Sequence, residues 1–161
     1  MVLTAPVRIN TGAGPYVDDA GNLWQADQYY TGGSQNNQGA GHPIAGTDKP
    51  PLFQDERWGN FSYHLPLANG IYEVRLYFAE IYSGCLSPGC RVFNVTANGQ
   101  PWLTGYDIAA HAGDYTADME TKTVTVTDNA LDLTFTGVAG SPQLAAIEIV
   151  NPGTPQTTVP S

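Results

Sequence analysis

The sequence predicts an all-β fold, an antiparallel β-sandwich, and three observations support this expectation. Apolar and polar residues alternate in several short segments, as is typical of strands with one buried face. Eighteen Gly and twelve Pro among 161 residues supply the turns that many short strands require. Helical periodicity is almost absent. A chain of this length fits one domain, which can bury about two-thirds of its unfolded surface.

The first two expected strands cover residues 60–67 and 71–80. Because successive side chains of a strand point to opposite faces, the alternation gives each segment one apolar face. The side chains expected to point into the core are Phe61, Tyr63, Leu65, Tyr72, Val74, Leu76 and Phe78.

Four further strands are expected in the second half of the chain. They cover residues 91–97, 121–127, 131–135 and 145–150. In the first of them, Phe93 and Val95 are expected to point inward. Asn98–Gly99 follows directly, and this dipeptide is the strongest short signal for a hairpin turn. Short alternating strands at this spacing are typical of antiparallel sandwiches.

Residues 11–51 differ from the rest, because they are rich in Gly, Asn and Gln and show little alternation. They predict a long surface region, and long loops on a β scaffold commonly carry function. Trp24 within this region, and Trp102 further on, have apolar neighbours. Both are expected in the core.

The two ends of the chain are not expected to belong to the folded domain. Residues 1–6 look like an added start ahead of a domain spanning residues 7–150. Residues 151–161 are rich in Pro and Thr and carry no charge, so they are expected not to pack and to serve as an interdomain linker or a frayed tail. No run approaches the roughly 18 apolar residues of a membrane-spanning helix, and no signal segment opens the chain.

Cys85 and Cys90 flank a Pro-Gly turn and are expected to close a small loop through a disulfide. Two alternatives stay open, namely two free thiols, or a metal pair completed by distant histidines. A disulfide implies an oxidising compartment, so the protein is expected to be secreted or at the cell surface.

The charge of the chain restricts its partners. Six Lys and Arg stand against fifteen Asp and Glu, which gives a net charge of −9. So few basic residues provide no electrostatic footprint for nucleic acid or an anionic membrane, and neither is expected as a partner. Charged residues are 13% and aromatic residues 11% of the chain. Many aromatics with little charge favour a neutral, ring-shaped ligand such as a sugar.

Catalytic motifs are weak in this sequence. Glu80 and Glu148 each fall on an expected strand and could form the carboxylate pair of a glycoside hydrolase, but structural pairing or solvent exposure explains both more simply. His111 is expected to be a loop residue that bonds to the backbone. Loop carboxylates such as Asp18 and Asp19 are of the kind that binds calcium, although the sequence places no calcium site.

Several aromatic residues fall in expected loops rather than in alternating strands. Trp58 lies at a strand entrance, Tyr82 lies just past a strand, and Tyr29–Tyr30 precede a pair of glycines. An aromatic ring can pack against the C–H face of a sugar while polar groups bond to its hydroxyls. The alternative for each ring is that it anchors its own loop in the core.

Six segments resemble those of malectin-like domains in order and approximate spacing. They are RINTGAG (residues 8–14), GNLWQAD (residues 21–27), LFQDERW (residues 52–58), YEVRLYFAEIY (residues 72–82), RVFNV (residues 91–95) and YDI (residues 106–108). Bacterial members are classed as carbohydrate-binding module family 57. The resemblance implies a jelly-roll-like, galactose-binding-like sandwich that binds glycan without cleaving it.

The resemblance also implies roles for individual residues. Trp58 stands where the family has a sugar-binding tyrosine, after the same Glu-Arg pair, and Tyr82 stands at the first of two adjacent binding aromatics. The second aromatic is Ser83 here, and Gly140 stands where the family has a binding aspartate.

These observations together predict a non-catalytic module that tethers a larger protein to a neutral oligo- or polysaccharide, with no cofactor required. Trp58 and Tyr82 are expected to stack on sugar faces, with Tyr29 and Tyr30 as further candidates. Residues expected to contact sugar hydroxyls are Asp27, Asp55, Asn60 and Asp107. The other domains of the same polypeptide are the remaining expected partners. The alternative is a structural or protein-interaction module of a cell-surface protein.

Overall fold

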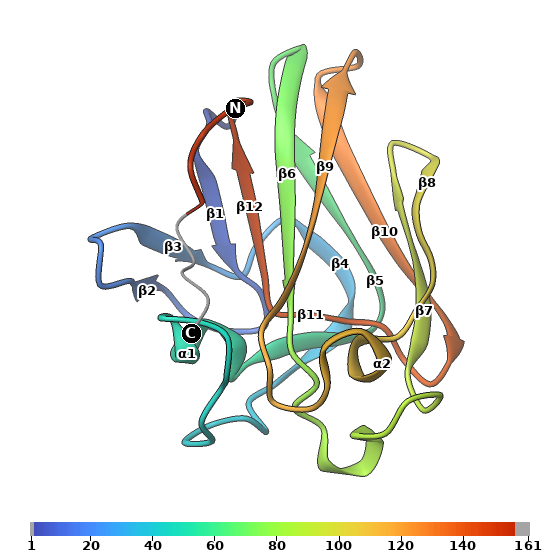
Figure 1. Cartoon of the computed structure of the whole chain (residues 1–161). Coiled ribbons are helices and arrows are strands. Elements are labelled where there is room, and N and C mark those ends of the chain that lie inside the picture. The colour runs from blue at the N-terminus through green and yellow to red at the C-terminus, as the bar shows by residue number, and fades with distance from the viewer. Residues whose placement is uncertain (1, 157–161) are drawn as a thin grey trace.

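Two β-sheets packed face to face form the body of the protein (Figure 1). The computed structural model describes residues 2–156. The first sheet runs in the order β2 (Tyr16–Val17), β3 (Leu23–Ala26), β1 (Val7–Asn10), β12 (Ala146–Val150), β6 (Gly70–Phe78) and β9 (Asp118–Val126). The second runs in the order β11 (Gln143–Leu144), β5 (Glu56–Pro66), β10 (Ala130–Ala139), β7 (Val92–Ala97) and β8 (Gln100–Tyr106), and β4 (Tyr30–Asn36) also pairs with β5.

Antiparallel pairing dominates both sheets, which confirms the predicted fold class. Among the named strands of the described chain, β1 and β3 alone pair in parallel. The six expected strands correspond to β5, β6, β7, β9, β10 and β12. The Asn98–Gly99 turn joins β7 to β8, and both of its residues have positive φ, at 49° and 78°.

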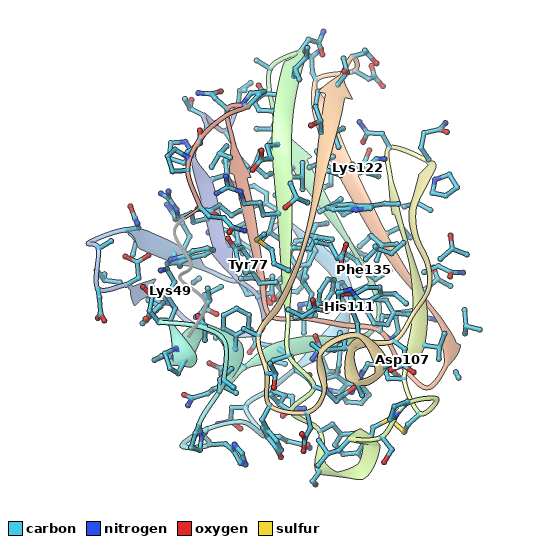
Figure 2. The ribbon with its side chains drawn as sticks, in the orientation of Figure 1. Lys49, Tyr77, Asp107, His111, Lys122 and Phe135 are labelled. Carbon is cyan, nitrogen blue, oxygen red and sulfur yellow. A yellow bond between two sulfur atoms is a disulfide. The ribbon has the colours of Figure 1, made fainter. Side chains whose placement is uncertain are left out.

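The inward faces of the expected strands form the main core between the sheets. Phe61, Tyr63 and Leu65 of β5 are buried there, as are Val74, Leu76 and Phe78 of β6 and Phe93 and Val95 of β7. Tyr72 is partly buried at the edge of this cluster. Phe135 of β10 stacks on Phe61 at 4.5 Å between ring centroids, and Figure 2 shows Phe135 within the body of the sandwich. The predicted core faces are therefore confirmed.

A second, smaller core covers the outer face of the first sheet. Trp24 of β3 is fully buried and meets Tyr77 edge to face, with ring centroids 5.7 Å apart. Phe53, at the end of the short helix α1 (Pro50–Phe53), also meets Tyr77 edge to face, with ring centroids 5.9 Å apart. The expectation for Trp24 is confirmed, whereas Trp102 of β8 is only partly buried against the main core.

Residues 11–51 are more regular than the sequence predicts. The region contains β2, β3, β4 and α1 as well as loops. β4 carries two glycines and mostly exposed side chains, so its extended form is set by backbone pairing with β5 rather than by an apolar face. An alternating pattern of apolar residues identifies a strand only when one of its faces is buried. The side chains of β4 are almost all exposed, so β4 shows no such pattern.

Arginines on the first sheet hold both Glu148 and the start of the C-terminal tail. Arg8 Nε and Arg75 Nη1 donate to the Glu148 carboxylate at 2.8 and 3.1 Å. Arg75 Nη1 also donates to the Pro155 carbonyl at 3.3 Å, and Nη2 donates to the Thr154 carbonyl. The expectation that the tail does not pack is wrong for these two residues, because their carbonyls satisfy a buried guanidinium. Residues 157–161 of the expected linker lie outside the described part of the chain.

Loops from both sheets meet at one end of the sandwich. Figure 1 shows the segment between β4 and β5, and the loop after β6, at the lower end of the view. A single turn of 3₁₀ helix, η1 (Ser83–Cys85), lies in the second of these loops. In the described chain, no helix has the length and apolar character needed to cross a membrane.

Candidate functional site

A cavity of about 670 Å³ opens at this loop end of the sandwich. This volume is within the range of about 300–1,000 Å³ that is common for small-molecule sites. Its walls come from the end of β4, the start of β5, the loop after β6 and the turn before β11. The lining residues include Trp58 and Tyr82 from the predicted set, and the amides Gln35, Asn36, Asn37 and Gln38.

The two aromatic rings in this cavity are both partly exposed to solvent. Trp58 is 40% exposed and Tyr82 is 43% exposed. Strands pair with Trp58 on both sides, through Ser34 of β4 and Gln143 of β11, so the indole stands on a fixed backbone. Tyr82 rests against Gly84, where an added Cβ would lie 2.7 Å from the phenol ring. The structure thus brings together the two aromatics that the sequence places far apart.

A disulfide between Cys85 and Cys90 forms part of the cavity wall, and the predicted pairing is confirmed. Asp107 supports the same loop by accepting a hydrogen bond from the Gly89 amide at 2.6 Å. Figure 2 shows the disulfide close to the labelled Asp107. The cross-link and this carboxylate together fix the wall on which Tyr82 stands.

Removing this cross-link should loosen the Tyr82 wall. The Cys85→Ser/Cys90→Ser double variant is expected to lose about 2 kcal/mol of unfolding free energy, as the closure of a short loop predicts. Ligand binding should weaken in parallel because Tyr82 is less well positioned. Chemical denaturation and calorimetric titration would measure the two effects, with Ser87→Ala in the same loop as the control. Unchanged affinity in the double variant would show that the loop holds its shape without the cross-link.

Beneath the rings lies a network of buried charged and amide groups. Arg91 donates to both oxygens of Glu80, from Nε at 2.7 Å and from Nη2 at 3.2 Å. Asn36 Nδ2 and Gln143 Nε2 donate to the two oxygens of Glu56 at 2.7 and 2.8 Å. Two buried carboxylates therefore share the neighbourhood of one guanidinium.

The electrostatic environment of Glu56 is unfavourable to its charge. Burial raises the pKa of Glu56 to about 7, and the Glu80 carboxylate adds to the rise, while Arg91 and the two amide donors oppose it. Burial also raises the pKa of Glu80, against the stabilising effect of Arg91. The cavity floor is therefore close to a protonation change at neutral pH.

Glu56 should make the protein less stable as the pH rises. In the unfolded chain a glutamate ionises near pH 4.5, whereas Glu56 keeps its proton to about pH 7 when folded. The folded state thus binds more protons between these values, and the free energy of unfolding falls across this window by about 3 kcal/mol on account of Glu56. Relative to wild type, Glu56→Gln should gain about this amount between pH 5 and pH 8.

Denaturant unfolding of both proteins at the two pH values would measure this difference. Asp19→Asn, in the exposed turn between β2 and β3, serves as the control and should not change the pH dependence. Parallel wild-type and Glu56→Gln curves would contradict the raised pKa of Glu56.

The structure does not place Glu80 and Glu148 in one catalytic cavity. Glu80 is bound by Arg91 and Glu148 by Arg8 and Arg75, and neither carboxylate lines the cavity described above. The Tyr77 hydroxyl also donates to Glu148 at 2.7 Å. Structural pairing thus accounts for both residues.

The expectation that Asp27 contacts sugar hydroxyls is wrong. Its side chain has no exposed surface. The carboxylate accepts hydrogen bonds from the Gly12 amide at 2.8 Å, Arg57 Nε at 2.8 Å and the Tyr63 hydroxyl at 2.6 Å. It joins three parts of the fold and has no surface left to offer a ligand.

The remaining sequence candidates do not line this cavity. Tyr29 packs against the main core, and the Arg57 guanidinium lies 3.5 Å from the centroid of the Tyr30 ring. Asn60 accepts a hydrogen bond from the Gly137 amide at 2.9 Å. Asp107 caps α2 (Ile108–Ala112) as well as holding the disulfide loop. Asp55 lines a neighbouring hollow.

The cavity wall also contains four amide side chains that the sequence analysis does not identify. Gln35, Asn36, Asn37 and Gln38 form one continuous run. The signal was the Asn/Gln-rich composition of residues 11–51, which indicated a functional surface without identifying the residues. An amide both donates and accepts hydrogen bonds, which suits a sugar hydroxyl.

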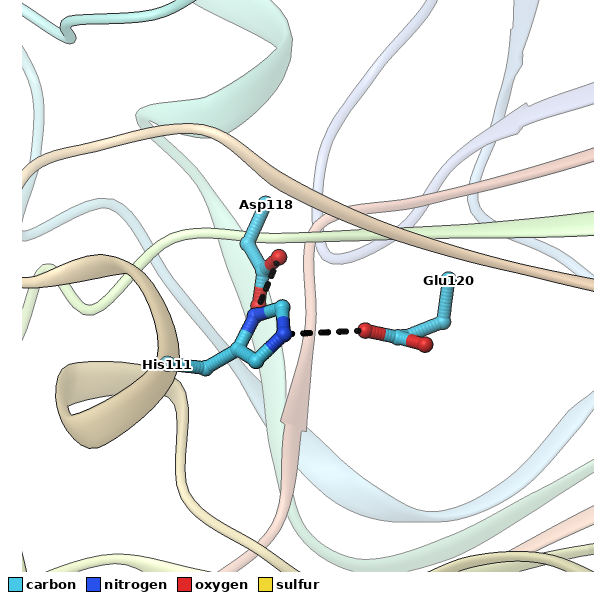
Figure 3. Close-up of side chains that lie close together, drawn as sticks. All are labelled: His111, Asp118 and Glu120. Atoms are coloured by element: carbon cyan, nitrogen blue, oxygen red, sulfur yellow. Dashed lines mark hydrogen bonds and ion pairs between the residues drawn. The ribbon is translucent and has the colours of Figure 1, made fainter.

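A separate cluster of potential metal ligands lies beside α2. His111 Nδ1 is 2.9 Å from Asp118 Oδ1, and His111 Nε2 is 3.7 Å from Glu120 Oε2 (Figure 3). His111 lies in a short helix, so the expectation of a loop is wrong, and its ring faces carboxylates rather than the backbone. Asp18 has both oxygens occupied by N–H donors from Ala20, Asn22 and Trp24.

Comparison with known proteins identifies a matching family and one curated relative. The family model described as "Malectin domain" matches residues 6–151. A kinesin-like protein of rice, KIN-14E (Oryza sativa subsp. japonica), is 33% identical over 113 residues, which cover 65% of this chain and 10% of that protein.

Solved structures share the fold at lower sequence identity. A β-glucuronidase of Bacteroides uniformis superposes with a TM-score of 0.81 at 23% identity, over 90% of this chain and 18% of that one. The extracellular domain of ANXUR1 from Arabidopsis thaliana superposes with a TM-score of 0.78 at 18% identity, over 89% of this chain and 47% of that one. This chain therefore spans only a fraction of each protein that it matches.

Proposed function

The chain belongs to the malectin domain family, and we propose on this basis that it is a non-catalytic module that binds a neutral oligo- or polysaccharide. The observation that carries the proposal is the pairing of two exposed rings, Trp58 and Tyr82, in one cavity. Amide side chains complete its wall. Rings beside hydrogen-bonding groups match the two kinds of surface that a sugar presents.

The charges around the cavity support a neutral ligand. Arg91 is the cation among the lining residues, and Glu80 already engages it through two hydrogen bonds. Glu56 lines the floor, and the chain as a whole carries a net charge of −9. An acidic sugar would thus meet no free cation at these walls and would be repelled by the overall charge.

The affinity should be modest. Each ring that stacks on a sugar contributes on the order of 1 kcal/mol, and part of this gain is offset by the loss of freedom on association. A dissociation constant of roughly 10 µM to 1 mM is expected for an oligosaccharide. A module of this strength acts by raising the local concentration of the domains joined to it. The confirmed disulfide supports a secreted or cell-surface location.

A glycan array that carries both neutral hexose oligomers and uronic-acid oligomers tests the proposal. Neutral glucans or related hexose chains should bind, and uronic-acid chains should not. A preference for the acidic chains would contradict the neutral-ligand proposal. An array without any bound glycan would overturn carbohydrate binding as a whole.

A protein or peptide partner is the second candidate. The structure of the plant peptide RALF23 in complex with FER and LLG2 contains a chain that matches this one, with a TM-score of 0.80 at 20% identity. A purely structural module would be expected to bury Trp58 and Tyr82 at a domain interface or against its own loops, and within this chain both rings are exposed rather than covered by loops. A peptide could use the same rings, so an empty glycan array would favour this candidate.

A further inference from the structure

A second hollow adjoins the cavity that holds the two rings. Its volume is about 400 Å³. Three residues, Gln35, Asn36 and Asn37, line both hollows, so the two lie on either side of the end of β4. The far wall of the second hollow is formed by residues 12–14 and Asp55.

Asp55 is the charged residue among those that line the second hollow. It is half-buried, and within residues 2–156 no hydrogen bond or ion pair engages its carboxylate. Burial alone raises its pKa. A carboxylate that has lost part of its hydration without gaining a partner is well suited to accept hydrogen bonds from ligand hydroxyls. Its neighbour Glu56, by contrast, accepts one amide hydrogen bond on each of its two oxygens.

The opposite wall leaves room for a ligand. Gly14 is exposed, and a Cβ added there would meet no atom within 4 Å. Gly14 does not have the positive φ that favours glycine, and a larger side chain there would point into open space. The space in front of Gly14 is therefore open because no side chain fills it. The shared amides of Gln35 and Asn37 are exposed between the two hollows and could bond to sugars on either side.

We propose that the two hollows form one continuous groove, in which a neutral hexose chain held by Trp58 and Tyr82 extends past Gln35–Asn37 to a further subsite at Asp55 and Gly14. This inference rests on the proposed function and adds that the ligand is a chain long enough to occupy both hollows. The second subsite has no exposed ring among its lining residues, so it binds by hydrogen bonds rather than by stacking. Its contribution appears only with ligands long enough to reach it.

Calorimetric titration with two series of glucose oligomers tests the inference. The probes are the cello- and malto-oligosaccharides from disaccharide to hexasaccharide. For wild type, the dissociation constant of the series that binds should fall by about tenfold from the shortest to the longest member, which corresponds to one or two added hydrogen bonds. Asp55→Ala and Gly14→Leu should bind the disaccharide as wild type does and lose the gain with length. Asp19→Ala, which removes an exposed acid that lines neither hollow, should keep this gain.

The possible results separate this inference from the proposed function. The second subsite is overturned if the disaccharide binds but longer oligomers bind no more tightly. It is also overturned if the higher affinity for longer oligomers survives in both Asp55→Ala and Gly14→Leu. Either result leaves the site at Trp58 and Tyr82 intact. Failure of every oligomer in both series, together with an empty glycan array, overturns both proposals. Melting temperatures of the variants within a few degrees of wild type would show that the fold is preserved, since neither substitution removes a contact described above.

Discussion

Replacing Trp58 by alanine is expected to weaken glycan binding by about tenfold or more. The indole is 40% exposed at the cavity wall and is held by strand pairing on both sides. The ring thus offers a flat, pre-positioned surface whose stacking on a sugar is worth on the order of 1 kcal/mol, and its removal also exposes the bound sugar face to water. Calorimetric titration with the best glycan from the array would measure the loss.

Two controls make this result specific. Trp58→Tyr keeps a ring at the same place and should lose much less affinity than Trp58→Ala. Leu23→Ala removes a side chain that is also exposed, at 50%, but lies on β3 in the other sheet, and should bind as wild type does. Because Trp58 is not part of the core, the melting temperature should change little. Equal affinity of Trp58→Ala and wild type would exclude the indole from the binding site.

Much of the fold could be predicted because most strands bury one face. Side chains of β5, β7 and β10 alternate between buried and more exposed positions, so their periodicity follows their burial directly. β4 could not be recognised in this way. It contains Gly33, where an added Cβ would meet the Trp58 carbonyl oxygen at 2.8 Å, so the close approach of β5 selects glycine there. This constraint comes from a partner strand, which local sequence patterns do not reveal.

The candidate site could be predicted in part for a similar reason. Trp58 and Tyr82 stand out as large rings outside the alternating pattern, and the structure places both in one cavity. The role of Asp27 is not predictable from local sequence, because Arg57 and Tyr63 converge on its carboxylate only in three dimensions. Asp55, by contrast, lines the second hollow, and within residues 2–156 its carboxylate has no hydrogen-bond or ion-pair partner.

Arg91→Met is expected to destabilise the protein by about 3–5 kcal/mol at pH 8. Its guanidinium is buried and binds Glu80, whose side chain has no exposed surface. Loss of the cation leaves Glu80 as an uncompensated buried charge, which is the costly way to break a buried ion pair. Arg91 Nη1 also donates to the Ser141 carbonyl at 2.5 Å, so the variant should release part of the cavity wall as well.

The loss should depend on pH in a defined direction. Burial already raises the pKa of Glu80 in the presence of Arg91, and removal of the guanidinium raises it further. The folded variant therefore takes up a proton more readily than the unfolded chain, so its stability is greatest at low pH and falls as the pH rises through the new pKa. Arg91→Met should thus lose less relative to wild type at pH 5 than at pH 8.

Denaturant unfolding at both pH values, with two further variants, would separate this cause from simple loss of packing. Glu80→Gln/Arg91→Met replaces the pair by neutral groups and should recover part of the loss at pH 8, because no buried charge remains. Lys122→Met removes a surface cation of β9 and should change the stability by no more than about 0.5 kcal/mol. If the double variant were as unstable as Arg91→Met at both pH values, the cost would lie in packing and in the Ser141 contact. The ion pair would then contribute little to holding the floor beneath Trp58 and Tyr82.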